Sequence, residues 1–191
     1  MKLLQDRIQK QGKILKGNVL KVDMFLNHQI DTKLLDEIGK EFYKLFKDKK
    51  PNKILTIESS GIAIAVACAR YFDFIPVVFA KKFTATNLSK DVYSSLEHSY
   101  TKNDDYNIQV SKEYLNENDN VLIIDDFLAN GEAMSSLIDI CKQANSQIAG
   151  CGVVICKTYQ NGENRIKDLG YDVKSLTRIR KIDEKGNIEF D

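Results

Sequence analysis

Short runs of branched apolar residues alternate along most of this chain with segments of helical periodicity. The apolar runs lie at residues 53–57, 76–80, 121–124 and 148–155. In the run at 121–124 neither face shows a polar alternate, a pattern typical of a strand that is buried on both faces. The segments with apolar residues at helical spacing lie at 32–47, 62–71 and 132–144. Strands that alternate with helices predict an α/β fold with a central parallel sheet, flanked by helices and joined by right-handed crossovers.

The first 35 or so residues depart from this alternation. An amphipathic helix is predicted at 3–11, a strand at 19–22 and a loop at 25–29. Asp31 is placed to cap the helix that follows. We expect this segment, about residues 1–35, to form a cap over the sheet edge, within a single domain that spans all 191 residues.

The middle of the chain contains a long polar segment. Residues 81–101 are rich in Thr, Ser, Asn and Lys and show no clear periodicity. Loops of that length inside a compact domain are usually functional lids. Beyond it, strands are predicted at 173–179 and, at an edge, at 187–190.

Composition excludes several classes of protein. A formal net charge of +1 gives no electrostatic footprint for nucleic acid or an anionic membrane. No run approaches 18 apolar residues, and the first ten residues lack the apolar core of a signal peptide. The four cysteines show no metal-binding spacing, so we expect buried free thiols in a reducing cytosol and a cytoplasmic protein.

The stretch from Val121 to Ala133 carries the clearest chemistry. Two adjacent carboxylates, Asp125 and Asp126, follow the buried run, and a short loop with Gly131 then leads into a helix. Backbone N–H groups at a helix N-terminus can hold a phosphate, while the carboxylates can take hydroxyls or a hydrated Mg²⁺. A sugar phosphate would use both halves. A buried strand with an acidic edge, as in any doubly wound protein, is the alternative.

This stretch resembles the phosphoribosyl-pyrophosphate (PRPP) binding motif of type I phosphoribosyltransferases. The generic loop ends in Thr-Gly-Gly-Thr, whereas this one lacks a hydroxyl and one glycine and is similar to the branch of the family that uses xanthine. The resemblance implies a phosphoribosyltransferase fold and a 5′-phosphate loop. That loop comprises Ala129, Asn130, Gly131, Glu132 and Ala133.

Two further groups match the family's pyrophosphate side. Ser59, Ser60 and Gly61 lie between a predicted strand and a helix, where small residues let the backbone approach an anion. Lys81 and Lys82 follow the next strand and would neutralise the leaving group, with a mobile loop at about 83–100 closing over the site. The alternatives are a simple N-cap and turn for the serines and a solvated surface pair for the lysines.

The resemblance also implies a base pocket. A lysine in the position of Lys157 faces the six-position oxygen of the purine; because lysine only donates hydrogen bonds, adenine should be rejected. Leu20 and Asn27 match the family's purine hood, and the Asn27 amide could donate to a two-position oxygen. An exposed lysine after a strand is the alternative for Lys157.

The function implied is transfer of ribose 5-phosphate from PRPP to xanthine, with Mg²⁺ bound mainly through PRPP and no direct protein ligand for the metal. A homodimer is the family expectation. A guanine or hypoxanthine transferase is the alternative within enzymes, and a non-catalytic PRPP-sensing regulator is the alternative outside them. Related regulators add a DNA-binding domain, for which residues 1–18 are too short.

Overall fold

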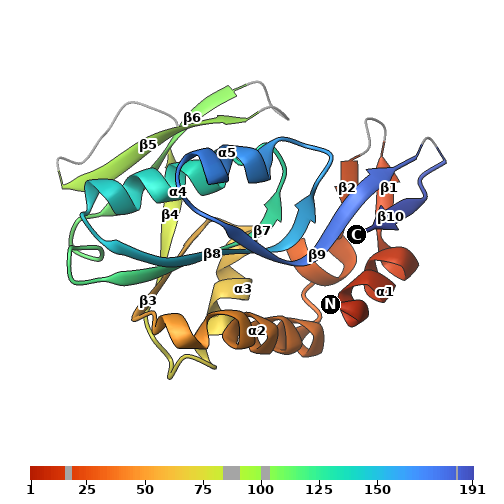
Figure 1. Cartoon of the computed structure of the whole chain (residues 1–191), viewed down its shortest axis with the longest axis horizontal. Helices are drawn as coiled ribbons and strands as arrows, with labels where there is room; N and C mark the ends of the chain where they lie inside the picture. Colours follow the sequence, from red (N-terminus) through yellow and green to blue (C-terminus); the bar gives the residue numbers. More distant parts are fainter. Residues whose placement is uncertain (16–18, 84–90, 100–103, 184) are drawn as a thin grey trace.

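A mixed eight-stranded sheet forms the centre of the structure, a computed structural model that describes residues 1–15, 19–83, 91–99, 104–183 and 185–191 (Figure 1). The strands, in spatial order, are β10 (Ile188–Phe190), β9 (Val173–Ile182), β8 (Gln147–Lys157), β7 (Asn120–Leu128), β3 (Lys53–Ile57), β4 (Val77–Phe83), β6 (Asp104–Ser111) and β5 (Val92–Ser99). The five strands from β9 to β4 pair in parallel, while β10, β6 and β5 add antiparallel edges. The predicted α/β fold with a parallel centre is confirmed.

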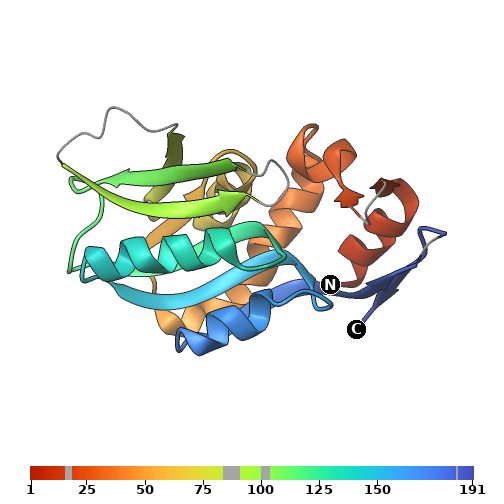
Figure 2. The ribbon, with the colours of Figure 1, turned by 90° about the horizontal axis from the view of Figure 1, so that it is seen from above.

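Helices cover both faces of this sheet. On one face lie α2 (Thr32–Phe46) and α3 (Ser60–Ala69), and on the other lie α4 (Glu132–Gln143) and α5 (Gly162–Asp168) (Figures 1 and 2). Asp31 caps α2 as predicted, since its Oδ1 accepts from the N–H groups of Lys33 and Leu34. The short helix α5 was not predicted from the sequence.

Strand β7 supplies the core on both faces. Leu122 and Ile124 pack in the cluster formed with α2 and α3, whereas Val121 and Ile123 pack in the cluster formed with α4. All four side chains are fully buried. Successive side chains of a strand point to opposite faces, so a two-sided strand needs an unbroken apolar run.

The N-terminal residues gather at the β9–β10 end of the sheet, near both termini (Figure 1). They form α1 (Lys2–Gln11), a two-stranded hairpin of β1 (Lys13–Leu15) and β2 (Val19–Lys21), and a π-helical turn, η1 (Asp23–Asn27). The prediction of a loop at 25–29 was therefore wrong in part, because residues 23–27 are helical. Phe25 and Leu26 of this turn are buried, which explains why it is ordered by packing.

The prediction of a long loop at residues 81–101 was also wrong in part. Strand β4 continues through Lys81 and Lys82, which pair with Gln109 and Ile108 of β6. Residues 92–99, within the predicted lid, form β5 and pair with β6 along their whole length. Polar residues are compatible with β5 because it is the edge strand of the sheet and pairs antiparallel with β6 alone. Residues 84–90, 100 and 101, which also belong to the predicted polar segment, lie outside the described residues.

Within the described ranges, none of the helices has both the length and the apolar character needed to cross a membrane.

The four cysteines are free and buried, which confirms the prediction made for them. Burial raises the pKa of the thiols of Cys68, Cys141, Cys151 and Cys156 to about 12 each. Since the thiolate is the reactive form, buried thiols with a high pKa are chemically inert.

We therefore expect iodoacetamide at pH 8 to label none of the four cysteines in the folded protein and all four in guanidinium chloride. With a pKa near 12, only about one thiol in ten thousand would be ionised at this pH, against roughly a quarter for a free cysteine. Intact-mass spectrometry measures the labelling. A single fast-reacting cysteine in the folded protein would contradict the burial described here.

Candidate active site

The paired carboxylates lie within β7 rather than at its end, because the strand continues to Leu128. Asp125 is 5% exposed, and Asp126 is half-buried. Each carboxylate accepts a bond from the next backbone N–H: Asp125 Oδ1 from Asp126 and Asp126 Oδ1 from Phe127, both at 2.9 Å. These bonds fix the orientation of both carboxylates before any ligand is present.

Asp126 also connects the N-terminal segment to the sheet. The Nδ2 group of Asn27, in η1, donates to Asp126 Oδ2 at 3.0 Å. Burial raises the pKa of Asp126 above its ordinary value, and its hydrogen bonds with Asp125, Phe127 and Asn27 act in the opposite direction. The structure thus brings together two predicted site residues that are 99 positions apart.

Lys157 lies beside the same carboxylate, at the last position of β8. Its Nζ lies 5.5 Å from the centre of the Phe127 ring, within the range of a cation–π contact. Burial lowers the pKa of Lys157, and the negative charge of Asp126 partly offsets that effect. Lys157 is half-buried, so the alternative of a simply exposed lysine does not describe it.

The predicted pyrophosphate loop lies next to Asp125, because β3 and β7 pair in parallel. A Cβ atom built on Gly61 would come 1.9 Å from Thr56 Oγ1 and 3.4 Å from Asp125 Oδ1, so only glycine fits there. Ser59 occupies the N-cap position of α3, but its side chain makes no capping bond. The simple capping alternative therefore lacks its characteristic contact.

The lysine pair reaches the same region. Glu58, which precedes the serines, accepts a bond from the backbone N–H of Lys82 at 2.6 Å. The side chains of Lys81 and Lys82 are exposed. This bond joins the backbone of Lys82 to the residue before the serines, and both lysines lie within β4 rather than after it.

The predicted 5′-phosphate loop forms the start of α4. Gly131 has φ +84°, a left-handed conformation that favours glycine, and stands at the N-cap of the helix. Because the first N–H groups of a helix have no partner within it, the loop presents donors at this end. Glu132, the first helical residue, forms an ion pair with Arg165 of α5.

Leu20 lies farther from this chemistry than Asn27 does. It is buried in β2, where it faces Ile14 in the hairpin register and approaches Gly12 at the end of α1. A hydrogen bond thus joins Asn27 to Asp126, whereas Leu20 belongs to the packing of the N-terminal segment.

Two neighbours of the site were not predicted from the sequence. Phe127 follows the carboxylates and packs below Lys157. Its position directly after the acidic pair was the available signal. Arg165 gave no such signal, because its partner Glu132 is 33 residues away and α5 itself was not predicted.

The carboxylates alone do not form a metal site. Among the described residues, no group of three or more His, Cys, Asp or Glu side chains could hold a metal ion. The carboxylate oxygens of Asp125 and Asp126 are donors of the type that Mg²⁺ prefers, so these two residues would hold the ion or its water if it were bound together with a phosphate-bearing ligand.

The comparison with known families is consistent with this geometry. Residues 22–190 match the family of the phosphoribosyl transferase domain. The chain is 55% identical over 183 residues to xanthine phosphoribosyltransferase 2 of Clostridium botulinum (strain Langeland), covering 96% of each chain. It is 51% identical over 191 residues to xanthine phosphoribosyltransferase of Pediococcus pentosaceus, covering 100% of both.

Solved structures show the same fold. The crystal structure of the adenine phosphoribosyltransferase of Giardia lamblia with 9-deazaadenine superposes with a TM-score of 0.75 at 24% identity, covering 92% of this chain and 97% of that one. This chain therefore shares the fold of that structure.

The half-buried Lys157 leads to a prediction on stability and pH. Its lowered pKa means that the folded protein holds the ammonium group less favourably than the unfolded chain does. The free energy of unfolding should therefore rise as pH increases from the folded-state pKa towards the unfolded value of about 10.4. Replacing Lys157 by Met removes this titration, so the free energy of unfolding of the native chain minus that of Lys157→Met should rise with pH across that window.

Urea unfolding at several pH values between 7 and 10.5 measures this difference. Lys174→Met, which removes an exposed lysine from the neighbouring strand β9, controls for the change in net charge. A stability difference for Lys157→Met that stays constant with pH would contradict the effect of burial on this group.

Proposed function

We propose that this chain, which belongs to the phosphoribosyl transferase domain family, transfers ribose 5-phosphate from PRPP to xanthine and releases pyrophosphate. The products would be xanthosine monophosphate and pyrophosphate, as in purine salvage. Full-length similarity to xanthine phosphoribosyltransferases supports the substrate. The observation that carries the proposal is the Asn27–Asp126 bond, since it closes the N-terminal segment over the carboxylates at the edge where base and ribose would meet.

Asp125 and Asp126 would act on the ribose. Positive charge develops at the anomeric carbon as pyrophosphate departs, and two preoriented carboxylates stabilise such charge without reorganising. Their bonds to the backbone N–H groups of β7 supply this preorganisation. When bound, Mg²⁺ would neutralise pyrophosphate charge, and Asp125 and Asp126 are the described residues placed to contact it or its water.

The two phosphate ends of PRPP would occupy separate loops. The residues from Ala129 to Ala133 would anchor the 5′-phosphate on N–H groups at the start of α4. Ser59, Ser60 and Gly61 would receive the pyrophosphate, with Lys81 and Lys82 neutralising it. Because no side-chain nucleophile is needed, most of the acceleration would come from positioning and electrostatics.

Lys157 would select the purine. It donates hydrogen bonds and accepts none, so it suits a six-position oxygen and leaves an amino group unpaired. Phe127 lies under its ammonium group and offers an apolar surface beside the carboxylates. Leu20, buried in β2, would support the base pocket through packing of the N-terminal segment.

The role expected of Asn27 changes in one respect. One amide N–H is already used by Asp126, while its Oδ1 atom is buried and has no hydrogen-bond partner within the described part of the chain. An ionised carboxylate only accepts, so Asp126 sets the orientation of this amide. We infer that Asn27 Oδ1 accepts a bond from a ring N–H of the purine, such as N3–H, which xanthine has and hypoxanthine and guanine lack.

We propose in addition that residues 1–35 act as the base-binding hood of a single catalytic domain, and that the protein works in the cytoplasm as a homodimer. The homodimer follows from the family expectation that a neighbouring subunit completes the pyrophosphate side. Sedimentation velocity of the full chain tests it.

The activity is tested by measuring pyrophosphate release from PRPP and Mg²⁺ with xanthine, guanine, hypoxanthine and adenine supplied separately. We expect xanthine to give the highest kcat/KM and adenine to give none above background. Asp125→Asn with Asp126→Asn should lower kcat by at least about a hundredfold, since it removes charge stabilisation of the transition state.

Other outcomes would redirect the proposal. If kcat/KM were highest for guanine or hypoxanthine, the chain would still be a phosphoribosyltransferase, but the argument from Asn27 would be refuted. Tight PRPP binding without turnover for any base would indicate the regulator instead. Undiminished turnover in the double variant would remove the carboxylates from the ribose site.

The orientation of Asn27 leads to a separate prediction. Asn27→Ala should lower kcat/KM for xanthine by roughly tenfold to a hundredfold, as expected for one lost hydrogen bond in a buried site. The value for hypoxanthine should change much less, because its N3 has no hydrogen to donate. An equal loss for both purines in steady-state kinetics would show that Asn27 acts only by holding Asp126.

A further inference from the structure

An acidic residue stands inside the proposed phosphate loop. Glu132 is the first residue of α4, directly after the N-cap Gly131. Its side chain is 16% exposed, so water screens its charge only in part. A carboxylate is itself a good ligand for the N–H groups at a helix N-terminus. Left free, Glu132 would compete with a phosphate for the same donors.

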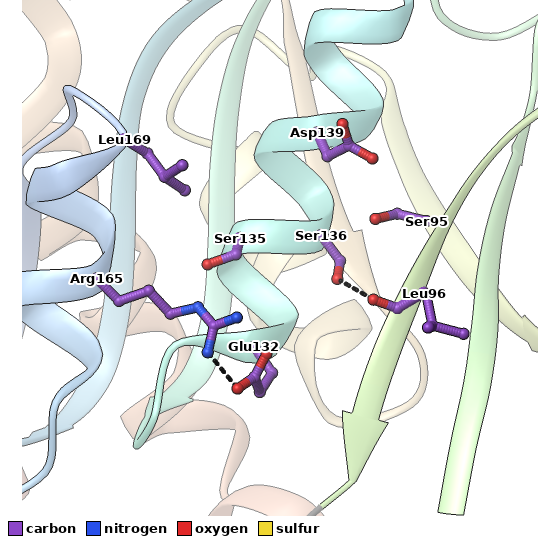
Figure 3. Close-up of a pocket in the computed structure, with 8 residues that line it drawn as sticks. All are labelled: Ser95, Leu96, Glu132, Ser135, Ser136, Asp139, Arg165 and Leu169. Atoms are coloured by element: carbon purple, nitrogen blue, oxygen red, sulfur yellow. Dashed lines mark hydrogen bonds and ion pairs between the residues drawn. The ribbon is translucent and has the colours of Figure 1, made fainter.

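Arg165 holds this carboxylate. Figure 3 shows the two side chains pointing towards each other, with Nη1 of Arg165 bonded to Oε1 of Glu132. The pair lies on the wall of a cavity of about 260 Å³ between α4, α5 and β5, which Ser135 and Ser136 also line. The carboxylate is therefore turned towards α5.

The backbone around Arg165 is packed directly against the loop. The N–H group of Gly162 donates to the carbonyl oxygen of Ala129 at 3.0 Å. A Cβ atom built on Gly162 would come 2.5 Å from that oxygen, and one built on Gly131 would come 3.2 Å from Gly162 Cα and 3.3 Å from Arg165 Cδ. Both glycines permit this close approach, and the aliphatic part of the Arg165 side chain therefore packs against the loop at Gly131.

We propose that Arg165 is a positioning residue for PRPP. It neutralises Glu132 and holds the carboxylate against α5, which leaves the N–H groups of the loop open to the 5′-phosphate. The role rests on the proposed function, because it requires that a phosphate bind at this loop. Arg165 acts through Glu132, so its effect should depend on the presence of that carboxylate.

The test is a double-mutant cycle with Arg165→Met, Glu132→Gln and the double variant, each as the full chain with Mg²⁺. PRPP binding is measured by calorimetry without purine, and KM for PRPP and for xanthine by steady-state kinetics. Arg165→Met should weaken PRPP binding by about tenfold, as for loss of a charged hydrogen-bond partner. The KM for xanthine, and kcat at saturating PRPP, should change by less than about twofold.

The double variant decides whether Arg165 acts through Glu132. With the carboxylate removed, loss of Arg165 should no longer matter, and PRPP affinity should return to within about threefold of the native value. Arg165→Lys, which keeps the charge, should also retain most of the affinity. If the double variant binds PRPP as weakly as Arg165→Met, Arg165 does not act through Glu132 and the proposal is overturned.

Arg178→Met is the matched control. Arg178 also pairs with a carboxylate of α5, Glu163, and its side chain is 40% exposed against 42% for Arg165. Breaking that pair should leave PRPP affinity unchanged. An equal loss in Arg178→Met would mean that docking of α5, rather than control of Glu132, sets the affinity, which would overturn the role of Arg165.

The outcomes also separate this role from the proposed function. If the native chain binds PRPP and Arg165→Met binds it equally tightly, only the role of Arg165 is refuted. If the native chain shows no PRPP binding, the role of Arg165 and the proposed function are both refuted. Thermal unfolding of each variant establishes that it is folded before its affinity is compared.

Discussion

The parallel pairing of β7 with β3 on one side and β8 on the other is the constraint on which the rest of the site depends. Parallel strands bring their carboxyl ends to one edge of the sheet, where ligands of open α/β folds bind. Here that edge receives Asp125 and Asp126 from β7, the serine loop from β3 and Lys157 from β8. The register of this pairing is fixed because alternate residues of β7 pack in two different hydrophobic clusters. A shift of the register by one residue would move the side chains of each cluster to the opposite face of the sheet.

Two groups of opposite charge, Asp126 and Lys157, lie at this edge. Burial disfavours the ionised form of both groups, raising the pKa of Asp126 and lowering that of Lys157. The charge of Asp126 favours the ammonium form of Lys157, and Asn27 favours the carboxylate form of Asp126. A buried charge is retained only where such partners exist. The N-terminal segment therefore contributes to the charge state of the sheet edge as well as covering it.

The sequence was most informative where a local pattern reflects burial. The apolar run of β7, the cap at Asp31 and the helical spacing of α2 each follow from packing or from neighbouring residues, and each was predicted. Strand β5 and η1 were missed, because β5 is a polar edge strand and η1 is a short turn whose order comes from distant packing. Helix α5 was missed because its seven residues carry only two buried positions, Gly162 and Ile166. The contacts of Asn27 and Glu132 span 99 and 33 residues, and no local pattern encodes them.

One of those distant contacts bears on the departure of the proposed 5′-phosphate loop from the generic motif. A glutamate at the first position of α4 suits the helix dipole, so it stabilises the free protein. The same charge opposes an anionic ligand at that helix end, and a loop with this residue needs a cation nearby. Arg165 provides it from an element that the loop already contacts through the Gly162–Ala129 bond. Substitutions that look unfavourable within a motif can thus be compatible with its function when a neighbouring element supplies the opposite charge, and the motif and α5 should be read as one unit.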